Sequence, residues 1–197
     1  MYLTALQFVE TVAPTVEPVT TAQVKTALRI DTSSEDTFLD TLIVAARQHV
    51  EAVTGRALVE RTLRWDVRYW ANEVILLKPP LVSVTSITYR DVDNAEQTWA
   101  ASNYEVDAKG GRILLSSTGT IPSSFDRYDA WQLTAQHGYD ADNVSPASAT
   151  GAVPEAIRSA IKLIVGDLYE NREATTPFKI HANKTVDMLL ASYRTRV

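Results

Sequence analysis

The spacing of apolar residues changes twice along this chain, and the changes limit the folds open to it. Over residues 39–53 apolar side chains recur every three or four positions, which is typical of a helix with one buried face. Over residues 63–69 they alternate with polar ones, which is typical of a half-buried strand. The helical spacing returns over residues 157–168. The sequence therefore predicts an α+β fold, in which a small β-sheet or barrel subdomain is inserted into a helical core.

The N-terminal part carries the start and stop signals of two helices. Residues 13–19 contain two prolines and are predicted to be an extended arm. Thr20 and Gln23 have the spacing of a capping box, so a short helix should follow and end near residue 30. Residues 31–34 supply Ser and Asp oxygens that can cap a second helix, and Gly55 stands where a left-handed C-cap is expected.

The middle of the chain is rich in strand signals. All four tryptophans fall in it, which indicates an aromatic core of its own, with Trp65 and Trp131 at least partly buried. The expected strands cover residues 62–69, 74–77, 82–89, 104–106, 112–115 and 131–137.

Helix signals return at Pro154, which suits a first helical turn, and a last short helix is expected over residues 185–193. Neither helical flank has enough apolar surface alone, so the two should pack together. The predicted helical core comprises Leu39, Leu42, Ala46, Val50, Ile157, Ile161, Ile164 and Leu168. The expected organisation is an N-terminal arm and helices (1–57), an inserted β subdomain (58–140), a linker (141–153), a core helix (154–176) and a C-terminal arm or helix (177–197).

A search for metal or cofactor chemistry gives no site. The chain has no cysteine, which excludes disulfides and thiolate metal sites and fits a reducing cytoplasm. Its three histidines, His49, His137 and His181, are not in metal-ligand spacing. Residues 91–94 begin like a calcium loop, but Glu96 occupies the position that needs glycine, so a polar hairpin turn is expected there.

Catalytic motifs are absent from the sequence as well. Gly110 and Gly111 precede a strand and lack the lysine of a phosphate-binding loop, so they indicate a hairpin turn. No nucleophile-elbow pattern occurs. We therefore predict no catalytic residues, no metal, no cofactor and no enzymatic activity.

Charge and hydropathy restrict the partners. The net charge of -5 argues against nonspecific binding to DNA, although it suits a surface past which DNA slides. The N-terminus has neither a basic segment nor a long apolar run, so no signal peptide and no membrane helix are expected.

The C-terminal segment is basic within an acidic chain and also contains apolar residues. Two interpretations remain open: a helix that packs on its own domain, or an arm that binds a partner protein. The residues that would bind in the second case are Met188, Leu189, Leu190, Tyr193, Arg194 and Arg196.

Several segments together resemble one family, the head–tail connector (adaptor) proteins of tailed phages. The resemblance covers nearly the whole chain in order, although Ser192 stands where a proline is common. It rests on residues 17–20 and 25–31, 45–47 and 51–56, 153–158 and 168–173, and 189–194.

The resemblance implies a structural virion protein at the head–tail junction, made in the host bacterial cytoplasm. Such proteins form a ring, usually dodecameric, under the portal protein. DNA passes through the lumen without sequence-specific binding, and a stopper or tail-completion protein docks on the ring; similar rings occur in gene transfer agents. The C-terminal segment would reach the portal. Compact members are helical, so the β insert marks a longer form, and the insert faces either outward or toward the tail.

Two alternatives to a connector remain open. One is a tail-completion or tail-terminator virion protein, which the β insert suggests. The other is a non-viral β module that binds carbohydrate or peptide.

Overall fold

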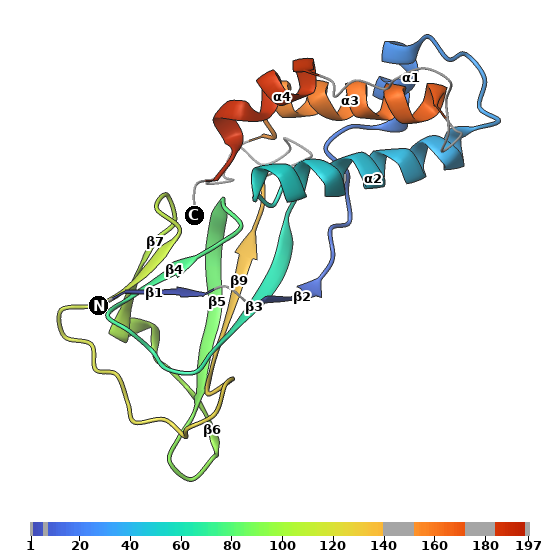
Figure 1. The fold of residues 1–197 in the computed structure, drawn as a ribbon. Helices are drawn as coiled ribbons and strands as arrows, with labels where there is room; N and C mark the ends of the chain where they lie inside the picture. The colour runs from blue at the N-terminus through green and yellow to red at the C-terminus, as the bar shows by residue number, and fades with distance from the viewer. Residues whose placement is uncertain (1, 6–7, 140–151, 172–183, 196–197) are drawn as a thin grey trace.

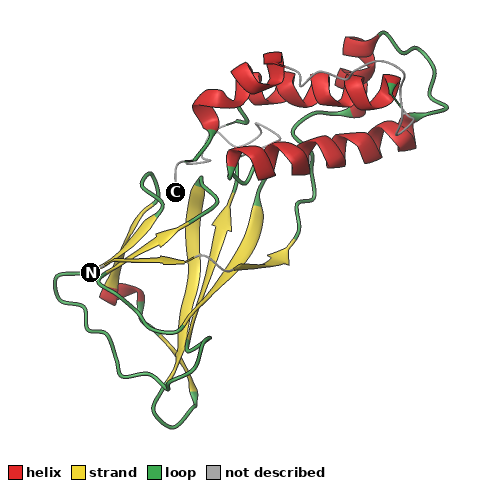
Figure 2. Cartoon of the chain, in the orientation of Figure 1, coloured by secondary structure: helices red, strands yellow, loops and turns green. Residues whose placement is uncertain are grey.

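The protein has a helical part and a β part that meet end to end (Figures 1 and 2). The computed structural model describes residues 2–5, 8–139, 152–171 and 184–195. The helices lie at one end and two sheets form the other, which confirms the prediction of an α+β fold.

The helical part contains four α-helices and a 3-10 turn within the described residues. Thr20 accepts a hydrogen bond from the backbone of Gln23, and the Gln23 side chain accepts one from the backbone of Thr20, so the predicted capping box is present. Gly55 ends the second helix at φ 71°, as expected. The elements are α1 (Thr21–Leu28), α2 (Asp36–Thr54), α3 (Glu155–Glu170), α4 (Lys184–Leu190) and the 3-10 turn Ala191–Tyr193.

The predicted start of α2 is wrong in one detail. The N-cap is Glu35, and no side chain caps the first turn. The oxygens of residues 31–34 are used locally instead, since Thr32 Oγ1 accepts from the backbone of Ser34 and its hydroxyl pairs with that of Ser34 at 2.7 Å.

One face of α2 packs against one face of α3, and α4 covers both. Leu42 and Ile164 are partly buried at the edge of this cluster. The buried apolar residues of the two long helices are Leu39, Ile43, Ala46, Val50, Ile157, Ala160, Ile161 and Val165.

Leu168 does not belong to the helical core, contrary to the sequence prediction. It is 40% exposed and lies in the last turn of α3. The neighbouring Tyr169 makes the contact with α2 instead: its hydroxyl donates to Glu35 at 2.5 Å, and its ring centroid lies 6.4 Å from that of Phe38.

The β part consists of two sheets. One has the order β1-β4-β8-β7, with β1 parallel to β4, and the other has the order β2-β3-β9-β5-β6, with every pair antiparallel. The strands are β1 (Tyr2–Ala5), β2 (Phe8–Val12), β3 (Arg61–Val67), β4 (Glu73–Leu76), β5 (Leu81–Arg90), β6 (Glu96–Thr98), β7 (Tyr104–Asp107), β8 (Arg112–Leu115) and β9 (Trp131–His137).

The first two strands were not foreseen. The sequence analysis assigned residues 1–57 to an arm and to helices, whereas the structure pairs β1 with β4 and β2 with β3. The β part is therefore built from two separate stretches of chain, which lie on either side of α1 and α2.

An aromatic core joins the two sheets. Trp65 and Trp131, predicted to be at least partly buried, are fully buried. The ring of Trp131 lies with its centroid 5.2 Å from that of Trp70, 5.4 Å from that of Trp99 and 4.9 Å from that of Tyr89. The same cluster takes aliphatic side chains from both sheets, so the sheets share one interior.

Both predicted hairpin turns are present. Asp91 and Ala95 close the β5–β6 turn through an N–H···O bond of 2.9 Å, with Asn94 in the left-handed region at φ 62°. Gly111, at φ 64°, reverses the chain between β7 and β8.

Candidate functional site

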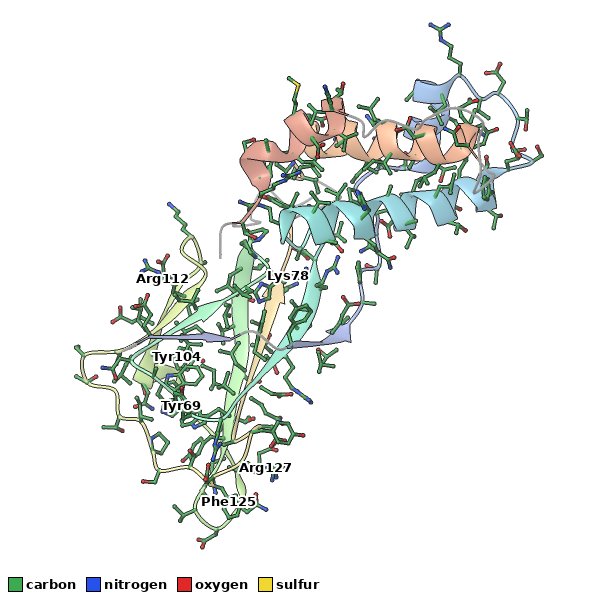
Figure 3. All side chains as sticks on the ribbon, viewed as in Figure 1. Tyr69, Lys78, Tyr104, Arg112, Phe125 and Arg127 are labelled. Carbon is green, nitrogen blue, oxygen red and sulfur yellow. The ribbon has the colours of Figure 1, made fainter. Side chains whose placement is uncertain are left out.

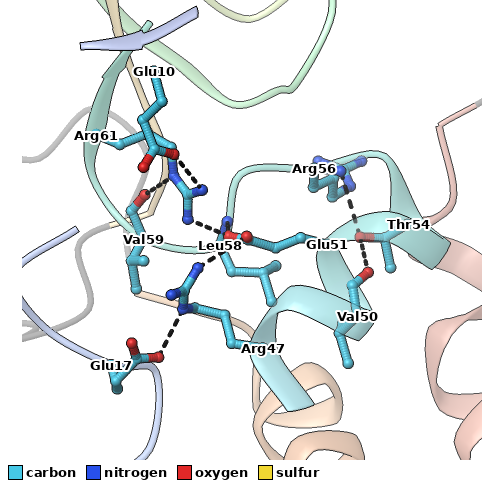
Figure 4. A network of polar contacts seen from close by, with 10 residues as sticks. All are labelled: Glu10, Glu17, Arg47, Val50, Glu51, Thr54, Arg56, Leu58, Val59 and Arg61. Carbon is cyan, nitrogen blue, oxygen red and sulfur yellow. Dashed lines mark hydrogen bonds and ion pairs between the residues drawn. The ribbon is translucent and has the colours of Figure 1, made fainter. Parts of the chain in front are cut away.

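A buried ion-pair network lies where the helical part meets the β part (Figure 4). Arg47 of α2 donates to Glu17 at 2.7 Å and to Glu51 at 3.0 Å. Glu51 also pairs with Arg61 of β3, which reaches Glu10 of β2 at 3.1 Å. The network thus links a helix, the arm before α1 and two strands.

Glu51 is the centre of this network. One of its oxygens accepts the backbone N–H of Leu58 at 2.9 Å, so it also fixes the turn between α2 and β3. Burial acts to lower the pKa of Arg47, but the hydrogen bond to Glu17 and the charge of Glu51 together raise that pKa above its usual value. Arg47 therefore stays charged, and the network connects α2 to the arm before α1 and to β3.

The C-terminal segment is attached to the same junction. Thr195 donates to the backbone oxygen of Thr54 through its backbone N–H at 2.8 Å and through its hydroxyl at 3.0 Å. Arg56 donates to the backbone oxygen of Tyr193 at 2.6 Å and to the hydroxyl of Tyr139 at 3.2 Å. The last described residues are thus fastened to the end of α2.

An open groove of about 700 Å³ lies beside this junction. Its walls come from the end of α2, the β4–β5 connection and the β7–β8 hairpin, with Phe8 and Thr195 completing them. Lys78 lines this groove, and Figure 3 labels its side chain near the helical end of the β part.

The structure describes two of the three histidines, His49 and His137. His137 is fully buried, and its Nδ1 lies 2.8 Å from the backbone oxygen of Lys78. Burial lowers its pKa to about 4. His49 is exposed on α2, and His181 lies outside the described residues. Across the residues that the structure describes, no cluster of three or more His, Cys, Asp or Glu side chains could hold a metal.

The candidate partner-binding residues of the C-terminal segment are dispersed by the structure. Met188 is 77% exposed, and Arg194 is exposed and paired with Asp187 at 2.9 Å. Leu190 is only 1% exposed and lies in the helical core, so it cannot contact a partner. Leu189 and Tyr193 are partly buried against that core. Arg196 lies outside the described residues.

The segment is therefore not a detached arm. Val186 and Leu190 belong to the helical core, in agreement with the interpretation that the segment packs on its own domain. Met188 and Arg194 still face outward.

Exposed apolar side chains gather at the end of the β part that is farthest from the helices. Phe125 and Tyr69 lie there in Figure 3. Tyr128 is 73% exposed, and Val92 is also exposed in the β5–β6 turn. The sequence analysis placed Tyr69 on the inner face of a strand, but β3 ends at Val67, so the alternation does not extend to Tyr69.

Sequence reasoning also missed the buried network. Arg47 and Glu51 are four residues apart and lie beside Ala46 and Val50, which is a signal for an ion pair on the buried face of a helix. Their partners Glu10 and Arg61 could be found only once β2 and β3 were known to pair.

Within the described part of the chain, no helix combines the length and the apolar character needed to cross a membrane.

The sequence was compared with protein-family models and with curated proteins, and the structure with solved structures. Residues 19–109 match the family model described as phage gp6-like head-tail connector protein, which confirms the resemblance inferred from the sequence. No curated protein matches the chain.

The fold is that of chains in gene transfer agent (GTA) particles. A chain of the structure titled "Neck of empty GTA particle computed with C6 symmetry" is 20% identical, with a TM-score of 0.75 over 98% of this chain and 97% of that one. A chain of "Virion of native gene transfer agent (GTA) particle" is 21% identical, with a TM-score of 0.74 over the same shares. A chain of the native neck, computed with C12 symmetry, is 20% identical and gives 0.70 over the same shares.

Proposed function

We propose that the chain is a structural subunit of a virion neck, on the basis of the match of residues 19–109 to the phage gp6-like head-tail connector family model. It would join the head of a tailed phage or gene transfer agent to its tail, by binding and without catalysis.

The shared fold carries this proposal. The likeness to the chain of the empty particle's neck extends over 98% of the residues, so it includes the β part as well as the helices. A non-viral β module with helical decoration would match in one part only. The likeness therefore favours a long connector in which the sheets are integral.

Ring formation is the proposed assembly. The neck structures with this fold are described with C6 and C12 symmetry, which supports a ring of identical subunits, dodecameric in our proposal. Such a ring needs a heterologous interface, in which one surface of the subunit binds a different surface of the next. Many modest contacts around the ring then add up to high avidity for the portal and for the tail side.

The outward face of the C-terminal segment is the proposed contact with the portal protein. Met188 supplies an exposed apolar side chain that can fit an irregular groove, and Arg194 supplies a charge. Leu189 and Tyr193 would flank them.

The proposed position of the chain in the neck implies two further partners, a protein on the tail side and DNA. A stopper or tail-completion protein would dock on the opposite side of the ring. DNA would pass through the lumen without sequence-specific contacts, and the net charge of -5 supports a lumen to which DNA does not adhere.

Mass measurement of the purified chain with its portal protein tests this function. We expect a complex that contains one ring of subunits per portal ring, and particles that lack the chain should have filled heads without tails. Binding to the tail tube alone would identify a tail terminator instead. Binding to neither would contradict a role in the neck.

A further inference from the structure

The groove beside the junction combines apolar walls with positive charge. Ile75, Leu77 and Pro79 line it together with Lys78 and Lys109, and Arg56 lies at its α2 side. The described lining includes no Asp or Glu. The chain as a whole has 24 acidic residues against 19 basic ones, so this is a local reversal of its charge.

Among the residues that the structure describes, the cations of the groove have no carboxylate partners. Elsewhere in residues 58–139 the arginines pair with acidic side chains; they are Arg61, Arg64, Arg68, Arg90, Arg112 and Arg127. The only two lysines of that stretch are Lys78 and Lys109, and neither has an ion pair to any residue that the structure describes. Arg56 donates to the neutral oxygens of Tyr193 and Tyr139.

Contacts between the lining residues hold the walls of the groove together. The backbone N–H of Leu76 donates to the oxygen of Gly111 at 2.9 Å, which ties the hairpin that carries Lys109 to the strand that leads to Lys78. The ammonium of Lys78 lies 5.8 Å from the centre of the Phe8 ring, so a cation–π contact helps to position it. A preformed site loses less entropy when it binds a ligand.

We propose that this groove binds an extended segment, both acidic and apolar, of a different protein of the neck. Apolar side chains of the segment would cover the walls, and its carboxylates would pair with Lys78, Lys109 and Arg56. The volume of about 700 Å³ is within the range of sites that enclose a short peptide or small molecule. The identity of the partner as a neck protein rests on the proposed function.

The chemistry argues against DNA as the occupant. DNA would place phosphates on the cations, but a phosphate backbone leaves the apolar walls uncovered, and the net charge of -5 repels it.

Photo-crosslinking in assembled particles tests the proposal. Benzoylphenylalanine in place of Ala108, which lines the groove, should crosslink to a peptide of another particle protein that contains apolar residues and at least one Asp or Glu. The double variant Lys78→Glu/Lys109→Glu should lower the crosslink yield per incorporated copy at least tenfold. The control Arg29→Glu/Lys162→Glu changes the net charge equally, outside the groove, and should leave the yield within twofold.

A reciprocal change makes the test specific. Replacing the acidic residue of the identified peptide with lysine should restore crosslinking to the Lys78→Glu/Lys109→Glu protein. Crosslinks to a second copy or to DNA, or no crosslink in particles that contain the chain, would overturn the groove proposal and leave the neck function standing. Absence of the chain from purified particles would overturn both.

Discussion

Glu51 of helix α2 and Arg61 of strand β3 form an ion pair whose side chains are only 9% and 10% exposed. The pair connects the helical part to the β part, and Arg47 binds the second oxygen of the same carboxylate. The guanidinium groups of Arg47 and Arg61 thus share the buried carboxylate of Glu51.

Replacement of Glu51 should therefore destabilise the protein strongly. We expect Glu51→Gln to lower the free energy of unfolding by about 3–5 kcal/mol, because it removes the buried carboxylate that Arg47 and Arg61 share and leaves each only its more exposed partner. The matched variant Glu10→Gln removes a more exposed partner of Arg61 and should cost less than about 1 kcal/mol. Urea unfolding of both variants measures the difference, and equal small effects would show that the network does not hold the junction.

The interface between α2 and α3 gives a second prediction. Ile161→Ala should cost about 2–5 kcal/mol, since Ile161 is completely buried and the change leaves a cavity. Leu163→Ala, on the exposed side of the same helix, should cost less than about 0.5 kcal/mol. Thermal and urea unfolding check both values. Similar costs at the two positions would mean that α3 does not pack on α2 in solution.

His137 predicts a pH dependence of stability. Lys78 O can only accept and Trp65 Nε1 can only donate, at 2.8 and 3.4 Å, so the imidazole is neutral with its proton on Nδ1. Because the folded pKa is about 4, below the ordinary 6.5, the unfolded chain binds a proton first as pH falls. The stabilisation is complete above pH 6.5 and is lost between 6.5 and 4.

The loss should be about 3 kcal/mol, from a shift of roughly two and a half pKa units. His137→Gln cannot titrate, so its unfolding free energy should fall less steeply over this pH window. Denaturant unfolding from pH 4 to 8 compares the two proteins, and parallel curves would contradict the assignment.

Met188 tests the proposed portal contact without disturbing the core. Met188→Asp should weaken binding to the portal protein at least tenfold, about 1.4 kcal/mol, while stability stays within about 0.5 kcal/mol. Leu163→Asp places the same charge on another exposed position of the helical part and should bind normally. If Met188→Asp binds the portal protein with unchanged affinity, the contact with the portal lies on another surface of the chain.

Deletion of residues 185–197 separates the segment's two roles. The deletion should lower stability, because it removes Val186 and Leu190 from the helical core. A truncated protein that unfolds at the same temperature as the full chain would show that the segment adds nothing to the fold.

The sequence was sufficient where one pattern was long and complete. The period of α2 together with Gly55 predicted that helix and its end, and the alternation from Trp131 to His137 gave both bounds of β9. The sequence did not predict strands in which buried and exposed side chains do not alternate. All five residues of β2 are exposed at a sheet edge, and β6 is a three-residue strand with no buried side chain, so neither has an apolar period to detect.

The surfaces were harder to predict than the cores. Composition identified a basic, apolar C-terminal segment, but only packing shows that Met188 points outward while Leu190 points inward. The groove could not be foreseen at all, because its walls come from separate parts of the chain that meet only after folding.

The position of β9 in its sheet has a consequence for biosynthesis. β9 lies between β3 and β5 and pairs with both, although it follows them by more than 40 residues. During synthesis on the ribosome, the edges of β3 and β5 that pair with β9 therefore stay unpaired until residue 137 has emerged. The buried face of α2 lacks its partner α3 for still longer. Neither the helical part nor the β part can therefore complete its core before the last third of the chain has been synthesised. The two cores should form at nearly the same time.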